Sequence, residues 1–180
     1  MARLIMWNMM TLDGFVEGEN RDISWHLDVW GEELERLSID QLKSAGGLMF
    51  GRVTYELMAN HWPGAEGEVA DFMNALPKYV FSRTLTTSGW NNTQIFRTGV
   101  PDTVARLKRD SAKDIYLFGS ADLAASLIPH RLIDEFRIAL NPLLLGTGSP
   151  LFRTGGKLRL RLLDSRSLSN GIVILRYEPN

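Results

Sequence analysis

The order of apolar and polar positions predicts alternating strands and helices through the first two thirds of the chain. Short, mostly apolar runs predict strands at residues 3–9, 48–50, 78–82, 93–96 and 114–118. Apolar residues at helical spacing, or helix start signals, predict helices at residues 30–44, 52–60, 101–109 and 121–128. This alternation is typical of a mainly parallel sheet with helices on both faces.

The last third of the chain is richer in strands. Residues 132–140 and 172–177 are predicted strands, and Asn170-Gly171 is a strong hairpin signal before the second of them. Residues 157–162 alternate basic side chains with leucine, which indicates a strand with one solvated face. We expect an antiparallel C-terminal edge on the same sheet. Residues 63–69 and 146–150 are expected to be loops.

Length and composition fit one domain spanning residues 1–180. The chain is 44% hydrophobic and 23% charged, and 20 basic side chains nearly cancel 21 acidic ones. This balance argues against nucleic-acid and membrane partners. The absence of cysteine excludes disulfides, thiolate catalysis and cysteine-ligated zinc. No apolar run suits a secretory signal or a membrane span, so we expect a cytoplasmic protein.

Three predicted strand ends carry residues suited to a ligand with several phosphates. In open α/β sheets, ligands bind beyond the carboxyl ends of the strands. Gly51, Arg52 and Thr54 offer close backbone approach, a guanidinium and a hydroxyl where a strand enters a helix. Ser82 and Arg83 follow another strand. The third junction consists of Gly119, Ser120, Ala121, Asp122 and Leu123.

Each motif also has a purely structural explanation. Gly51-Arg52 fits a tight turn, Ser82-Arg83 an ordinary strand exit, and Ser120 a helix cap. The structural explanation is preferable for any one motif, but three in one parallel-sheet pattern favour a ligand pocket. The Rossmann glycine motif, the phosphate-binding loop and the nucleophile elbow are absent. The three histidines show no metal-ligand spacing, and we predict no metal site.

The order and spacing of five motifs resemble the RibD C-terminal-domain family, which is related in fold to dihydrofolate reductase. The resemblance covers nearly the whole chain and implies a dihydrofolate-reductase-like fold. It also implies NADPH-dependent hydride transfer to a pterin or pyrimidine, as in 5-amino-6-(5-phosphoribosylamino)uracil reduction in riboflavin biosynthesis. The motifs are Thr11-Leu12-Asp13-Gly14, Gly51-Arg52-Val53-Thr54-Tyr55, the segment from Phe118 to Leu123, Leu132-Ile133-Asp134-Glu135, and the segment from Asn141 to Gly146.

The resemblance assigns cofactor roles by position. It implies that Arg52 and Thr54 hold cofactor phosphates and that Ser82 and Arg83 lie by the adenosine 2′-phosphate. The third junction, residues 119–123, would wrap the pyrophosphate. No acidic residue is next to either arginine in the sequence, which favours NADPH over NADH.

The resemblance also places Ser24 and Trp25 near the substrate and the nicotinamide, although Trp25 fits a hydrophobic lid equally well. A carboxylate on the first helix would support substrate protonation, and we rank Asp28 before Glu32 and Glu35 because it follows Ser24-Trp25. This helix is acidic where the riboflavin-pathway enzyme carries adjacent arginines. That difference argues against a phosphorylated ribosyl substrate.

Two other functions stay open. One is a reductase of another small conjugated carbonyl or imine, and the other is a binding protein that holds a nucleotide or pteridine without turnover. In every case the expected partner is a small molecule. We also expect a homodimer, because the strand-rich C-terminal edge must be covered or paired and the resembled family tends to dimerise.

Overall fold

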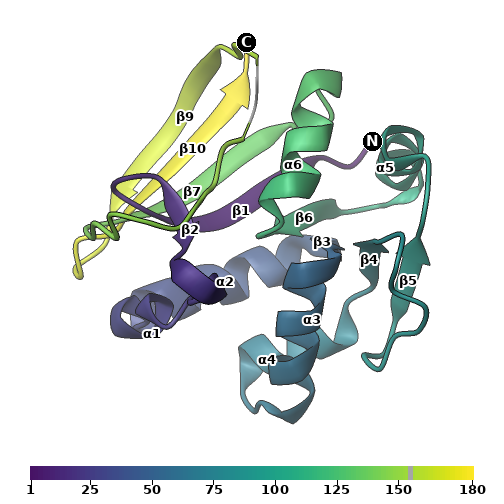
Figure 1. The fold of residues 1–180 in the computed structure, drawn as a ribbon, viewed down its shortest axis with the longest axis horizontal. Helices are drawn as coiled ribbons and strands as arrows, with labels where there is room; N and C mark the ends of the chain where they lie inside the picture. The colour runs from purple at the N-terminus through teal and green to yellow at the C-terminus, as the bar shows by residue number, and fades with distance from the viewer. Residues whose placement is uncertain (154–155) are drawn as a thin grey trace.

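The computed structural model describes residues 1–153 and 156–180, which form an eight-stranded sheet between two helical layers (Figure 1). Six strands run parallel, and the last two pair antiparallel with their neighbours. This confirms the expected mainly parallel sheet with an antiparallel C-terminal edge. The strand order is β5 (Thr93–Phe96), β4 (Lys78–Phe81), β3 (Ala45–Gly51), β6 (Asp114–Phe118), β1 (Leu4–Thr11), β7 (Glu135–Asn141), β10 (Val173–Pro179) and β9 (Leu160–Ser167).

Helices cover both faces of the parallel part of the sheet (Figure 1). On β1, Ile5 and Trp7 belong to one core cluster, and Leu4 and Met6 belong to the other. Burial on both faces explains why this strand shows no alternation. One layer contains α2 (Glu32–Ser44), α3 (Arg52–His61) and α4 (Glu68–Ala75), and the other contains α5 (Val100–Asp110) and α6 (Ala121–Leu127).

None of the helices in the described ranges combines the length and the apolarity needed to cross a bilayer. The helix expected at 30–44 begins only at Glu32, because Trp30 and Gly31 are extended and separate it from a short helix that was not expected, α1 (Trp25–Val29). β7 starts at Glu135 rather than at residue 132.

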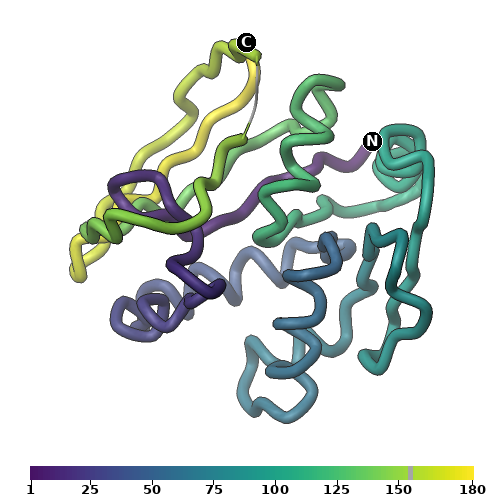
Figure 2. Tube along the Cα trace, viewed as in Figure 1, coloured from purple at the N-terminus to yellow at the C-terminus, as the bar shows by residue number. Residues whose placement is uncertain are grey.

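The loop expected at 146–150 pairs instead with the segment that follows β1. β2 (Phe15–Glu17) and β8 (Ser149–Pro150) form a separate antiparallel ladder, and Figure 2 shows the two segments side by side. The Asp13 carboxylate accepts a hydrogen bond of 2.7 Å from the amide of Gly146. Gly148 has φ +144°, and a Cβ there would collide with the carbonyl of Glu17. The 146–150 segment is therefore fixed against β2.

Two further expectations are wrong. The segment 63–69 is not simply a loop, because a 3-10 turn spans Trp62–Gly64 and α4 begins at Glu68. The buried face of α4 holds Val69, Ala70 and Met73. The neighbouring glycines and charges obscured this helical spacing in the sequence. The strand expected at 157–162 begins at Leu160, and all its residues are exposed, so it has no buried face.

The exposed edge strand β9 generates a prediction about assembly. Leu162 is 51% exposed and Leu160 and Leu163 are each 37% exposed, so this edge offers apolar surface beside unpaired backbone groups. We predict a homodimer that covers this edge. Sedimentation at micromolar concentration should give the dimer mass, and Leu162→Glu should shift the protein toward monomer. Leu144→Glu, at an exposed position outside β9, is the control. A monomeric wild type would contradict the prediction.

Candidate active site

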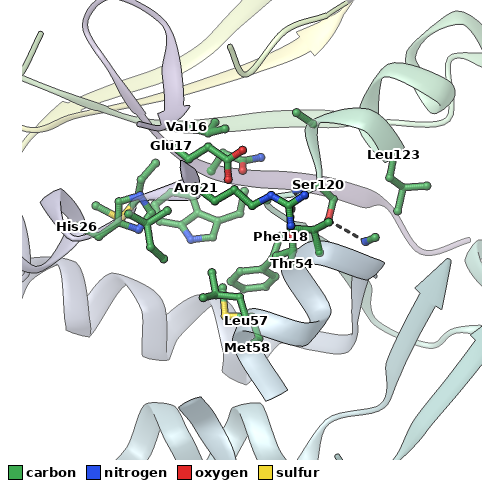
Figure 3. Close-up of a pocket in the computed structure, with 18 of the residues that line it drawn as sticks. Val16, Glu17, Arg21, His26, Thr54, Leu57, Met58, Phe118, Ser120 and Leu123 are labelled. Carbon is green, nitrogen blue, oxygen red and sulfur yellow. Dashed lines mark hydrogen bonds between the residues drawn. The ribbon is translucent and has the colours of Figure 1, made fainter. Parts of the chain in front are cut away.

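A cleft of about 1850 Å³ opens where β1, β3 and β6 end (Figure 3). β1 pairs with β6 only over Leu4–Trp7 but runs on beside β7 to Thr11, so β6 ends first. The space beyond its end is the site where open α/β sheets bind ligands. The cleft walls come from β1, the segment 16–27, α2, α3 and the ends of β3 to β6.

Two strand-to-helix junctions are hydrogen-bonded to each other at one wall of the cleft. The amide of Gly51 donates to Ser120 Oγ at 2.7 Å, the bond dashed in Figure 3, and the amide of Ser120 donates to Thr54 Oγ1 at 3.0 Å. Gly119 has φ +53°, and a Cβ there would lie 2.9 Å from Thr54. The sequence motifs at 51–54 and 119–123 therefore form one surface, and all their predicted residues line the cleft.

Both helices that start at these junctions lack a side-chain cap among the described residues. Gly51 precedes α3, and Ser120, with φ +59°, precedes α6 while its hydroxyl accepts from Gly51 instead. The cap explanation for Ser120 is therefore wrong. The first amides of a helix without a capping side chain keep unsatisfied donors and positive potential. This wall suits an anionic ligand.

The ends of β4 and β5 supply a second positive region. Ser82 is buried, and its hydroxyl accepts hydrogen bonds from the amides of Thr84 and Leu85, so it shapes the turn. Arg83 lines the cleft, and its guanidinium has no partner among the described residues. Arg97, at the end of β5, donates to the carbonyl of Arg83 at 3.3 Å and also lines the cleft.

Two charged residues at this wall are already ion-paired. Arg52 contacts Glu56 at 2.8 Å, one helical turn along α3, so the expectation that no acid lies beside Arg52 is wrong. Helical spacing, not sequence adjacency, brings the two together. Asp122 contacts Arg153 at 2.7 Å across the cleft mouth. Both pairs are substantially exposed and contribute little stability.

The wall formed by β1, the segment 16–27 and α2 contains only part of the predicted substrate site. Ser24 lines the cleft, and its hydroxyl donates to Asp22 at 3.0 Å. Trp25 is buried and stacks edge-on against His26 at 4.2 Å, which places it behind the lining residues. Asp28 is exposed and is not among the described lining residues, whereas Glu35 lines the cleft from α2.

Two buried polar groups of this wall have no hydrogen-bond partner among the described residues. They are the amide nitrogen Nδ2 of Asn8 and the ring nitrogen Nε2 of His26. Asn8 is 4% exposed, and both residues line the cleft. A buried polar group without a partner costs about 1–3 kcal/mol. Burial lowers the pKa of His26 to about 4, although a hydrogen bond to the backbone of Val16 and the charge of Asp22 oppose the shift.

Sequence reasoning missed Asn8, His26 and Arg97. Arg97 follows a predicted strand just as Arg83 does, so the same strand-end argument would have found it. Asn8 interrupts an apolar run in a strand expected to be fully buried, which is itself a signal. His26 had no local signal, because its burial depends on the fold of the 16–27 segment against the sheet.

The sequence and the fold are similar to those of known proteins. The chain is 32% identical over 185 residues to the uncharacterized protein YyaP of Bacillus subtilis, covering 99% of this chain and 95% of YyaP. A crystal structure from Shewanella, provisionally assigned to riboflavin biosynthesis, has a TM-score of 0.81 at 20% identity and covers 100% and 99% of the two chains. Dihydrofolate reductase from Enterococcus faecalis, complexed with NADP(H), has a TM-score of 0.68 at 11% identity, with coverage of 99% and 96%.

These structural likenesses define an α/β protein with the dihydrofolate-reductase-like fold. The family model of the RibD C-terminal domain matches residues 2–174. The chain therefore belongs to the RibD C-terminal domain family, as the motifs at 11–14, 51–55 and 118–123 indicated.

The buried His26 generates a prediction about stability and pH. Its folded pKa of about 4 lies below its ordinary value of 6.5, so between these values the unfolded chain binds a proton that the folded chain does not. The free energy of unfolding should therefore fall as the pH drops from 6.5 to 4, by up to about 3 kcal/mol from this group. Urea unfolding at pH 7 and pH 4.5 should show a smaller loss for His26→Gln than for wild type.

The control is His130→Gln, which removes an exposed histidine and should lose as much stability on acidification as wild type. An equal loss in wild type and His26→Gln would contradict the buried, neutral state of His26.

Proposed function

We propose that this protein is an NADPH-dependent reductase that transfers a hydride to a pterin- or pyrimidine-type heterocycle. The observation that carries the proposal is the pair of hydrogen-bonded junctions at 51–54 and 119–123, where two helices begin at the cleft without side-chain caps. The free amides suit the phosphates of a dinucleotide. The dihydrofolate reductase that shares this fold is complexed with NADP(H), which supports the same cofactor here.

The residues at this wall fit such a cofactor. Gly119 lies so close to Thr54 that a side chain there would fill the surface on which the pyrophosphate would rest. Arg83 and Arg97 lie further along the cleft and would face the adenosine phosphate. Arg52 would contribute less, because Glu56 already neutralises part of its charge.

When bound, NADPH supplies the hydride, and one proton completes the saturation of a double bond in the substrate. The protein orients the ring and controls the source of that proton. On α2, Glu35, Ser38 and Gln41 are three residues apart and line the cleft together, so one helix face borders the substrate space. Glu35 is the carboxylate on this face.

A steady-state assay of NADPH oxidation tests the proposal. Dihydropterins, aminouracils, and small conjugated carbonyls and imines are the candidate substrates. Turnover with a heterocycle supports the proposal, and turnover only with a conjugated carbonyl or imine would assign the alternative reductase activity. Tight binding of NADPH without turnover of any candidate would favour a binding protein instead.

Cofactor preference gives a second prediction. A charge-assisted hydrogen bond to the 2′-phosphate contributes about 1.5–3 kcal/mol, so NADPH should bind at least about tenfold more tightly than NADH. Arg83→Ala should weaken NADPH binding and leave NADH binding unchanged, and Arg52→Ala should have the smaller effect. Arg106→Ala, at an exposed position on α5 outside the lining residues, is the control. If the wild type bound NADPH and NADH with equal dissociation constants, the 2′-phosphate would not lie against Arg83.

The position of the carboxylates gives a third prediction. We propose that Glu35 supports substrate protonation, because it borders the cleft whereas Asp28 points to solvent. Glu35→Gln should lower turnover about 10²-fold or more and leave NADPH affinity near wild type. Asp28→Asn should keep near-normal turnover. The reverse result would assign the role to Asp28, and full activity in both variants would assign protonation to water.

A further inference from the structure

Two residues that line the cleft from different elements each carry a buried polar atom without a partner. Asn8 Nδ2 comes from β1, and His26 Nε2 comes from α1. Native proteins pair nearly all buried polar groups, so each exception needs an explanation. The two other buried unpartnered atoms in the described ranges, Trp25 Nε1 and Asn141 Oδ1, belong to residues that do not line the cleft. Asn8 and His26 are therefore the pair that a ligand would satisfy.

The hydrogen bond to Val16 determines what His26 offers. A hydrogen bond to the backbone of Val16 raises the pKa of the ring against the effect of burial, and since Nε2 has no partner, we assign this bond to the other nitrogen. A neutral imidazole that donates from one nitrogen has an acceptor lone pair on the other. His26 therefore has a free acceptor, while Asn8 has a free amide donor, on residues that line the cleft. Together they match a ring that carries a carbonyl and an N–H group.

The surroundings of this pair are apolar. Val16, and Leu57 and Met58 of α3, line the same cleft (Figure 3). Leu27, Trp30 and Leu57 are 79%, 44% and 43% exposed, which is unusual for large apolar side chains gathered around one opening. This mouth would cover a planar, apolar part of a ligand.

The charges at the end of the cleft assigned to Asn8 and His26 disfavour an anionic ligand. Glu17, Glu19, Glu35 and Glu66 line the cleft, and none has an ion pair or a hydrogen bond to another described side chain. The cation on the same side is Arg21, and in Figure 3 its side chain points along the cleft toward Ser120, away from His26. The other arginines of the cleft, Arg52, Arg83, Arg97 and Arg153, are on the cofactor side.

We propose that Asn8 and His26 recognise the carbonyl and N–H groups of an uncharged lactam heterocycle, whose remaining part is apolar and carries neither phosphate nor carboxylate. This inference rests on the proposed function, because it assigns the substrate class of the same cleft. Asn8 and His26 are specificity residues in this assignment. The substrate differs from a phosphoribosyl compound and from a glutamate-bearing pterin.

Stability of the ligand-free protein tests the inference first. An unpartnered polar group is costly, so Asn8→Leu should leave the melting temperature unchanged or raise it. Asn141 on the adjacent strand is the matched control, because its Nδ2 donates to the carbonyls of Met10 and Ala139 at 3.1 and 2.8 Å. Asn141→Leu should lower the melting temperature. An equal drop in both variants would show that Asn8 is structural and would overturn the inference.

Ligand binding tests it second. The probes are the uncharged 6-methylpterin, lumazine and thymine, each compared with an anionic counterpart, dihydrofolate or uridine 5′-monophosphate, by calorimetry with and without NADPH. At least one uncharged probe should bind more tightly than its anionic counterpart. Asn8→Leu and His26→Phe should each raise the dissociation constant of that probe by about tenfold or more, because each variant loses one hydrogen bond between a buried side chain and the probe.

The outcomes separate the inference from the proposed function. Unchanged NADPH affinity in both variants shows that the cofactor site is intact and that the loss belongs to the substrate end. If wild type fails to bind NADPH, the proposed function fails, while probe binding without cofactor still decides the inference. Tighter binding of the anionic compounds, no binding of any uncharged probe, or equal probe binding by wild type and variants would overturn it.

Discussion

The amide of Gly51 donates to the hydroxyl of Ser120, and the amide of Ser120 donates in turn to the hydroxyl of Thr54. These two bonds join the junction after β3 to the junction after β6. The bonded residues are 69 positions apart in the first bond and 66 in the second. Because the Ser120 hydroxyl is used between strands, it cannot cap α6, and α3 begins after a glycine that has no side chain to offer. The same bonds that fix the two junctions therefore leave two sets of helix amides for a ligand.

This arrangement divides the cleft into two walls of opposite character. The wall built on the junctions carries arginines and free amides, and its main contacts are hydrogen bonds between backbone and short side chains. The other wall carries carboxylates, exposed apolar side chains and two buried polar groups without partners. A dinucleotide suits the first wall and an uncharged heterocycle suits the second, so the difference in charge between the walls favours separate places for the two ligands along one cleft.

The sequence predicted the sheet and the first wall well, because both are encoded locally. β5 and β6 have the predicted bounds, Gly51 and Gly119 were found because each directly follows a predicted apolar strand, and Thr54 was found in the first turn of the helix after Gly51. The ladder between β2 and β8 was missed because segments of three and two residues, far apart in sequence, are too short to show a periodicity of their own. The burial of His26 and the exposure of Asp28 were unpredictable for a similar reason. Their environments depend on how α1 packs, which no local pattern specifies.

The central position of β1 has a consequence for how the chain reaches this structure during synthesis. Leu4 pairs with Ile115 and Ile5 with Glu135, so β1 is synthesised more than 100 residues before either of its neighbours. Until then, a run of fully apolar side chains from Leu4 to Met6 has no partner strand on either edge. Such non-local pairing slows folding, since the entropy of closing a long loop is lost before any contact compensates it. The nascent chain therefore depends on being kept from aggregation until β6 and β7 have emerged.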